Sequence, residues 1–100
     1  MEIRIYSVGF SADLKLESYI REKLEKVKKY NDTLIGVDVY LKLENSGQVK
    51  DKVVELKARV PGPYQFVKNE DKTFESSFDK ALETFKRQLK KHNDKLKSVK

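Results

Sequence analysis

The sequence contains no cysteine, one histidine, and only four glycines and two prolines among its 100 residues. Without cysteine, a disulfide framework, thiolate chemistry and a cysteine-based metal site are all impossible. The glycines are scattered over turn and strand-start positions, so the chain has no glycine-rich phosphate loop. It also has no run of about 18 apolar residues, the minimum for a membrane-spanning helix. These absences remove several classes of enzyme and the membrane-spanning proteins.

The single histidine, His92, falls on the apolar stripe of a predicted helix. A partly buried packing residue near the helix end explains it better than a catalytic base does. The spacing supports no Ser-His pair and no pair of catalytic carboxylates. The adjacent acids Glu70 and Asp71 are typical of a solvated loop rather than of a metal site. We therefore expect a non-enzymatic protein with no cofactor, no metal ion and no small-molecule substrate.

Length and composition indicate one small folded domain. One hundred residues, of which 38% are hydrophobic and 38% charged, can build a single core under a strongly hydrated surface, so we predict one domain over residues 1–100. Met1 leads directly into the strand-like segment MEIRIYSV, without the basic and apolar regions of a signal peptide. The expected location is the cytoplasm.

Positive charge is concentrated at the end of the chain. The net charge is +6, and residues 86–100 hold seven basic residues and one acid, which accounts for the whole excess; residues 1–85 hold fifteen of each sign. A pI near 9.4 favours a polyanionic partner, nucleic acid before an anionic membrane surface. A membrane-surface helix would need an exposed apolar face, whereas here that face is needed for the core.

Apolar residues spaced by three and four predict two amphipathic helices. The first covers residues 14–30, with Ser11 or Asp13 as N-cap, and its buried side carries Leu16, Ile20, Leu24, Val27 and Tyr30. The second covers residues 73–96, capped by Asp71 or Thr73, and its apolar stripe comprises Phe74, Phe78, Ala81, Leu82, Phe85, Leu89, His92 and Leu96.

Alternating apolar residues predict four strands, at residues 2–8, 34–44, 53–60 and 64–68. In the second strand, the side chains predicted to point toward the core are those of Ile35, Val37, Val39, Leu41 and Leu43. In the third strand they are those of Val54, Leu56, Ala58 and Val60. Asn45–Gln48 form the turn between these two strands, and Asn69–Lys72 connect the last strand to the second helix. The predicted fold is α+β, in the order β-α-β-β-β-α: a four-stranded mixed sheet with both helices packed on one face.

Basic side chains line one flank of the second predicted helix. Lys80, Arg87, Lys91 and Lys95 share that flank at about 100° per residue. Ordinary solubilising charge is one explanation. Lys23 and Lys26 of the first helix, however, can face this flank and form a two-sided basic channel that fits a phosphate backbone. Tyr6, Tyr19, Tyr40 and Tyr64 could stack on unpaired bases, although packing within the fold is the favoured role for most of them.

Three segments resemble the ribosome hibernation promoting factor family, which includes ribosome-associated inhibitor A. They are RQLKKHNDKLK at Arg87–Lys97, ESYIREKLEKVKKY at Glu17–Tyr30 and the strand VDVYLKLE. The resemblance implies the same β-α-β-β-β-α fold. It also implies binding to the small ribosomal subunit and its rRNA, in the mRNA and tRNA channel of the intact ribosome, and inhibition of translation in stationary or starved cells. Because the chain stops at Lys100 without a second domain, it resembles the short members.

The family motifs match six basic residues of this chain: Lys23, Lys26, Arg87, Lys91, Lys95 and Lys97. The resemblance implies that these bind rRNA, and Lys80 and Lys90 join them because they share the basic surface. The segment PGPYQFVKNEDK departs from the family pattern, which leaves the register of the last strand open. Two other classes of function are also consistent with the sequence: a general RNA-binding or RNA-chaperone module, and a domain whose basic helix binds an acidic protein.

Overall fold

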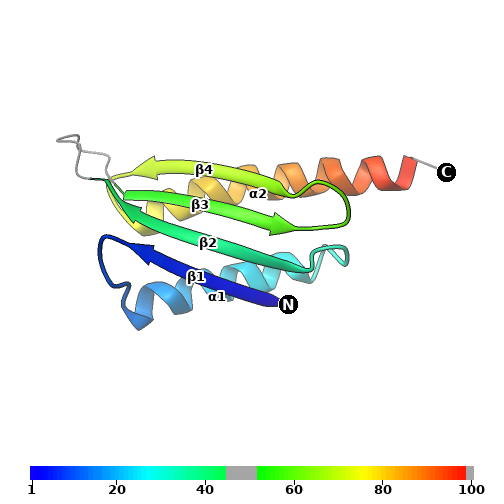
Figure 1. The fold of residues 1–100 in the computed structure, drawn as a ribbon. Coiled ribbons are helices and arrows are strands. Elements are labelled where there is room, and N and C mark those ends of the chain that lie inside the picture. Colours follow the sequence, from blue (N-terminus) through cyan, green and yellow to red (C-terminus); the bar gives the residue numbers. More distant parts are fainter. Residues whose placement is uncertain (45–51, 99–100) are drawn as a thin grey trace.

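The computed structural model describes residues 1–44 and 52–98, with side chains as far as Lys95. The predicted order of elements is confirmed (Figure 1). The turn predicted at Asn45–Gln48 lies outside the described residues. The elements are β1 (Glu2–Val8), α1 (Leu14–Lys28), β2 (Gly36–Leu43), β3 (Lys52–Arg59), β4 (Gln65–Asp71) and α2 (Phe74–Ser98).

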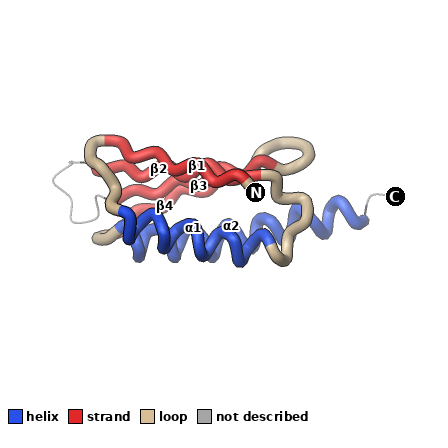
Figure 2. Tube along the Cα trace, turned by 90° about the horizontal axis from the view of Figure 1, so that it is seen from below, coloured by secondary structure: helices blue, strands red, loops and turns tan. Residues whose placement is uncertain are grey.

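The described strands form one mixed sheet in the order β1-β2-β3-β4. β1 pairs with β2 in parallel, and the other two pairings are antiparallel. Both helices cover the same face of this sheet, as Figure 2 shows, so the opposite face has no helix over it. The predicted mixed α+β architecture is therefore confirmed, including the shared face of the two helices.

The core lies between the sheet and the two helices. The predicted inward residues Val54, Leu56, Ala58 and Val60 are all buried. The apolar stripe of α2 is buried from Phe74 to Leu89, but no described α2 residue beyond Leu89 is buried. The final turns of α2 extend past the sheet in Figure 1. The most basic part of the sequence is therefore carried on a helical segment that contributes little to the core.

Two of the predicted boundaries were wrong. β4 continues through Asp71, so Asn69 and Asp71 belong to a strand rather than to a connecting loop. Antiparallel pairing explains the extension, because Asp71 is the register partner of Lys52 at the start of β3. Ile35 was predicted to be inward but is 59% exposed, since it precedes β2 instead of lying within it. Leu43, at the other end of β2, is also exposed.

The end of α1 also differs from the prediction. Tyr30 was expected to close the buried side of the helix, yet it is 85% exposed. α1 ends at Lys28, and the chain then turns, with the Tyr30 N–H donating to the Val27 carbonyl at 3.1 Å. This turn ends the helical periodicity two residues before Tyr30. Lys29 is the C-cap of the helix, and the Asn31 side-chain amide donates to the same Val27 carbonyl at 2.8 Å.

The cap predictions can now be decided. The Asp13 carboxylate accepts from the Leu16 N–H at 2.8 Å, which makes Asp13 the N-cap of α1. The Thr73 hydroxyl accepts from the Ser76 N–H at 3.1 Å and caps α2. Asp71 instead stabilises the junction between β4 and α2: its carboxylate accepts from the Ser76 hydroxyl and forms an ion pair with Lys80.

Candidate nucleic-acid interface

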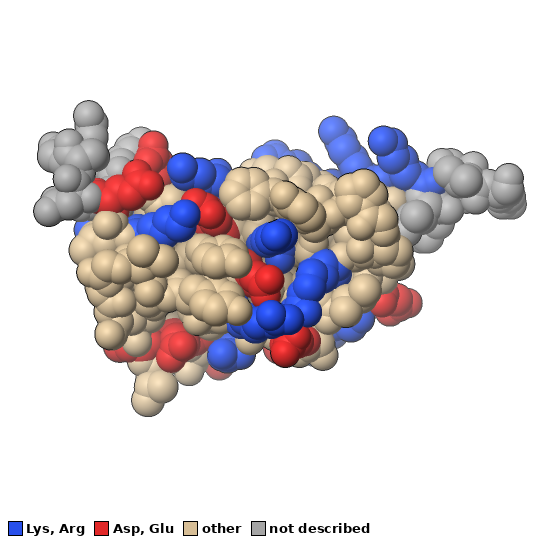
Figure 3. Space-filling model, in the orientation of Figure 1, with Lys and Arg blue, Asp and Glu red and all other residues tan. Residues whose placement is uncertain are grey.

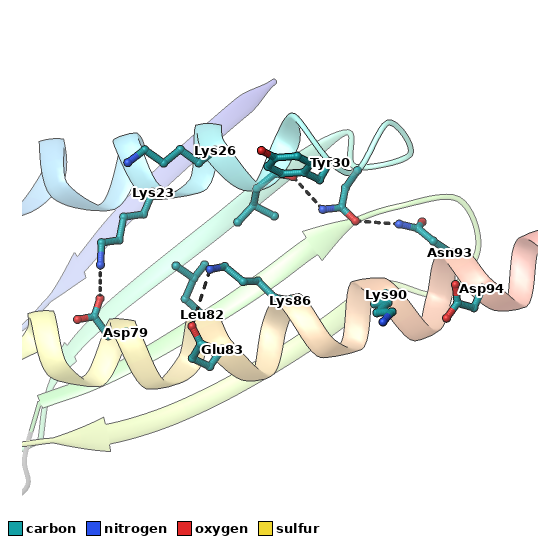
Figure 4. Close-up of a pocket in the computed structure, with 12 residues that line it drawn as sticks. Lys23, Lys26, Tyr30, Asp79, Leu82, Glu83, Lys86, Lys90, Asn93 and Asp94 are labelled. Carbon is teal, nitrogen blue, oxygen red and sulfur yellow. Dashed lines mark hydrogen bonds and ion pairs between the residues drawn. The ribbon is translucent and has the colours of Figure 1, made fainter.

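The two helices lie side by side and run in the same direction, with a groove between them. Near the start of α2, Lys23 contacts Asp79; farther along both helices, Asn31 contacts Asn93. Figure 4 shows this groove with the side chains that line it. The lining residues are Lys23, Lys26, Val27, Tyr30 and Asn31 from the α1 side, and Asp79, Leu82, Glu83, Lys86, Lys90, Asn93 and Asp94 from α2.

Lys23 is held in place by two neighbours. Its ammonium lies 3.0 Å from a carboxylate oxygen of Asp79 and 4.6 Å from the centroid of the Tyr19 ring. The Tyr19 hydroxyl donates to the same carboxylate, at 2.7 and 2.9 Å from its two oxygens. The Tyr19 hydroxyl and the Asp79 carboxylate raise the pKa of Lys23 above its ordinary value. The position of the Lys23 ammonium is therefore fixed, and its charge is already paired with the Asp79 carboxylate.

The groove carries charge of both signs. Its four lysines face three acids, Asp79, Glu83 and Asp94. Lys86 lies 3.8 Å from Glu83, whereas Lys26 and Lys90 form no ion pair with any described residue. A phosphate entering the groove would meet two unpaired ammonium groups, one from each helix. The groove is thus a weakly cationic site rather than the strongly basic channel expected from the sequence.

The predicted two-sided channel was wrong about the flank of α2. Lys80, Arg87, Lys91 and Lys95 do not line the groove. Lys80 instead pairs with Asp71 at the end of β4, on the side of α2 away from α1. Arg87 donates to the Thr84 hydroxyl at 3.3 Å, one helical turn from Lys80. Because α1 packs against the Asp79 flank of α2, the flank with Lys80 necessarily faces away from it.

The basic residues of α2 therefore form a ridge along the exposed crest and both shoulders of its C-terminal half. We call this the α2 ridge; its members are Lys86, Arg87, Lys90, Lys91 and Lys95. The sequence interpretation had not assigned Lys86 to the site, although it stands four residues before Lys90, a spacing that puts both on one side of a helix. The Lys97 side chain lies outside the described part of the structure.

The face of the sheet without helices is mixed in charge, as Figure 3 shows. Arg4 and Arg59 lie near Glu2 and Asp38, and Lys42 pairs with Glu55 at 2.9 Å. These contacts pair three cations of this face with acids. The mixed charge makes the face a poorer candidate for a phosphate backbone than the helices are.

The tyrosines considered as base-stacking residues are mostly engaged within the fold. The rings of Tyr6 and Tyr40 stack on each other across β1 and β2, with centroids 5.1 Å apart. Tyr19 packs edge-on against Phe78 with centroids 6.1 Å apart, and the Lys57 ammonium lies over the ring of Tyr64 at 4.3 Å. The expectation of packing within the fold is confirmed for Tyr6, Tyr19 and Tyr40.

His92 is partly buried, as its position on the apolar stripe predicted. Its Nε2 atom is buried without a hydrogen-bond partner among the described residues. Within residues 1–44 and 52–98, no group of three acids or histidines is arranged to hold a metal ion. In the same part of the chain, no helix has the length and apolar character needed to cross a membrane.

Comparison with known proteins places this geometry among ribosome-associated families. Residues 3–97 match the family model described as Sigma 54 modulation protein / S30EA ribosomal protein. A curated protein of Pseudomonas putida, named ribosome hibernation promoting factor, is 28% identical over 99 residues, which cover 99% of this chain and 93% of that protein.

Two solved structures share the fold. A ribosomal subunit interface protein from Coxiella burnetii superposes with a TM-score of 0.84 at 18% identity, covering 94% of this chain and 99% of that one. The N-terminal domain of Thermus thermophilus Protein Y gives a TM-score of 0.77 at 24% identity, covering 92% of this chain and 99% of that one. At these identities the likeness shows a common fold.

Proposed function

The chain belongs to the Sigma 54 modulation protein / S30EA ribosomal protein family, and from this premise we propose that it is a ribosome hibernation factor. In this proposal it is a non-enzymatic cytoplasmic protein whose residues 1–100 form one ribosome-binding domain. It occupies the mRNA and tRNA channel of the small subunit and inhibits translation in stationary or starved cells. The name of the Pseudomonas putida relative supports the hibernation role.

The observation that carries the proposal is the α2 ridge. All five of its cations are exposed. Lys90, Lys91 and Lys95 lie beyond Leu89, where no described residue of α2 is buried, so these three are accessible from several directions. Ribosomal RNA presents closely spaced phosphates along its helices. Protein side chains cannot read the bases through the deep major groove of those helices. A ridge of long, flexible cations fits such a surface through phosphate contacts, without base-edge readout.

We assign rRNA contacts to cations on both helices. The ridge members Arg87, Lys91 and Lys95 reach phosphates on the outer side of α2, and Lys90 does so from the groove side. Lys23 and Lys26 extend the cationic surface onto α1. Lys80 contributes less, because it is already paired with Asp71. Lys97 continues the ridge in sequence and completes the proposed set.

Co-sedimentation tests this proposal directly. Purified protein is mixed at physiological salt with isolated small subunits, isolated large subunits, intact ribosomes and an unrelated structured RNA, and the pellets are compared. We expect pelleting with small subunits and intact ribosomes only. Equal pelleting with every RNA would instead support a general RNA-binding or RNA-chaperone module. No pelleting with any RNA would contradict both functions and favour an acidic protein partner.

A further inference from the structure

Tyr30 is the most exposed aromatic side chain among the described residues, at 85% exposure. It stands just after α1, one helical turn beyond Lys26 in the sequence, and lines the same groove (Figure 4). Its hydroxyl forms no hydrogen bond with any described residue, and its ring pairs with no aromatic ring in the same part of the chain. The fold therefore gives this ring no packing role, although it lies at one end of a cationic groove.

The backbone that carries Tyr30 is well anchored. The N–H of Tyr30 donates to the Val27 carbonyl, and the N–H of Asn31 donates to the Lys28 carbonyl, both at 3.1 Å. Immediately after Tyr30, the Asn31 amide accepts from the Asn93 amide of α2 at 2.8 Å. Because this turn is tied to both helices, its backbone loses little conformational freedom when a flat ligand stacks on the ring, which favours binding.

The surroundings of the ring suit one kind of ligand. The groove has an apolar floor made by Val27 and Leu82, both at 4% exposure. Lys26 and Lys90 stand on its two sides without an ion pair to any described residue. The groove thus combines a stacking surface at one end, an apolar floor and one lysine without an ion pair on each side. Those are the features that bind a nucleobase together with its own phosphate.

We propose that the Tyr30 end of the groove binds one unpaired nucleotide, with its base stacked on the Tyr30 ring and its phosphate between Lys26 and Lys90. This inference rests on the proposed function and names the form of RNA that the groove selects. A base within a continuous duplex is stacked on its neighbours and cannot reach the ring while its phosphate stays in the groove. Bulged or looped nucleotides satisfy both contacts.

The first experiment compares three RNA hairpins with the same stem, each closed by a polyethylene glycol linker so that no loop nucleotide is present: one with a single bulged adenosine, one with an abasic residue at that position, and one fully paired. We expect the wild-type protein to bind the bulged hairpin about tenfold more tightly than the other two, since stacking on one aromatic ring is worth roughly that factor. Tyr30→Ala should remove this preference, and Tyr30→Phe should retain it. Tyr64→Ala, which removes an exposed tyrosine on the other face of the sheet, is the matched control and should leave the preference unchanged.

The second experiment detects the stacking directly, by fluorescence. The chain contains no tryptophan, so Tyr30→Trp introduces a single indole at the proposed site. We expect its fluorescence to be quenched by the bulged adenosine hairpin and not by the abasic one. In the Tyr64→Trp control, neither hairpin should quench the emission. Quenching by a polyglutamate peptide but not by RNA would overturn the inference in favour of an acidic protein segment.

The two proposals fail in different ways. If the wild-type protein pellets with no ribosomal subunit and binds no hairpin, the proposed function is wrong and the inference falls with it. If it pellets with small subunits but binds all three hairpins equally, with Tyr30→Ala indistinguishable from wild type, only the inference is overturned. A uniform loss of affinity in Tyr30→Ala for all three hairpins would also contradict it, because stacking on an unpaired base cannot act on the paired hairpin.

Discussion

The side-chain amides of Asn31 and Asn93 are hydrogen-bonded at 2.8 Å, although the two residues are 62 positions apart in the chain. Asn31 also donates to the Val27 carbonyl, and Asn93 accepts from the Thr33 hydroxyl at 2.8 Å. This cluster joins the end of α1 to the part of α2 that follows Leu89, the last of its described residues to be buried. It is a polar connection between this part of α2 and the rest of the fold.

Replacing Asn93 should therefore destabilise the protein. In Asn93→Ala, Asn31 and Thr33 each lose a partly buried partner, and we expect the free energy of unfolding to fall by about 1–2 kcal/mol. Urea unfolding followed by circular dichroism measures this change. Asp94→Ala, at the exposed neighbouring position, should change stability by less than about 0.5 kcal/mol. Equal midpoints for the two variants would show that the amide contact contributes nothing.

Charge reversal on the α2 ridge should abolish ribosome binding. We expect Arg87→Glu combined with Lys91→Glu to prevent pelleting with small subunits while leaving the unfolding midpoint nearly unchanged, because both side chains are exposed. The control combines Lys15→Glu with Lys68→Glu, an identical change of charge at exposed positions outside the ridge and the groove. If both double variants lose binding equally, net charge rather than the ridge determines affinity.

Salt dependence adds a quantitative check of the same contacts. Neutralising roughly six phosphates should give a slope of about −4 to −5 for the logarithm of affinity against the logarithm of salt concentration. Lys91→Ala should reduce the steepness by about one, and Lys68→Ala should not. A shallow slope for the wild-type protein would indicate that contacts with ribosomal proteins dominate.

Asp79 competes with phosphate for Lys23, so removing its charge should strengthen RNA binding. In Asp79→Asn the amide keeps the shape of the side chain, and the net charge of the groove rises by one. We expect affinity for small subunits to increase severalfold, and fluorescence anisotropy or filter binding can measure it. Lys23→Glu should weaken binding. A weaker Asp79→Asn complex would show instead that the carboxylate positions Lys23 for RNA.

Asp71 should make stability fall at low pH. The Lys80 ammonium, the Ser76 hydroxyl and the Lys72 N–H hold the pKa of the Asp71 carboxyl well below its usual range. Because the pKa is lower in the folded state than in the unfolded state, the ionised carboxylate stabilises the fold at pH values above the unfolded pKa of about 4. This stabilisation is lost as the pH falls toward the folded pKa. The free energy of unfolding should therefore decrease below about pH 4.

The Asp71→Asn variant isolates this contribution. It lacks the titrating group, so its stability should fall less steeply in acid, and the difference from wild type should narrow below about pH 4. Asp94→Asn, at an exposed site with no ion pair to a described residue, should follow the wild-type acid profile. If Asp71→Asn also follows it, another carboxylate is responsible for the acid sensitivity.

The fold was predictable because its signals are periodic and local. The stripe from Phe74 to Leu89 and the alternation around Val54 and Leu56 each identify one element and its buried side. Strand ends were predicted less well. Asn69 and Asp71 carry no apolar signal, and their pairing with β3 depends on a register that only the assembled sheet defines. Ile35 is apolar but lies outside the strand, so its exposure follows from the chain path rather than from its residue type.

The sequence predicts which charged residues belong to the candidate site, but not how those residues are arranged around the groove. The sequence correctly separates Lys80 and Arg87 from Asp79 on opposite flanks of α2, since helical geometry alone requires it. Which flank faces α1 depends on how the two helices pack, and α1 packs against the flank with Asp79. The exposure of Tyr30 could not be foreseen either, because its spacing continues the α1 stripe while the backbone has already left the helix.

The parallel course of the two helices has an electrostatic consequence. Both helices direct the negative ends of their macrodipoles toward the same end of the molecule, where their final carbonyl groups repel anions. Unlike helix N-termini, these helix ends present no free N–H groups to phosphate, so the helices attract it only through lysine and arginine side chains. Lys26, which lines the groove, lies in the last turn of α1 and also stabilises the end of that helix. Neutralising it, for example by acetylation, would therefore weaken RNA binding and the end of α1 together.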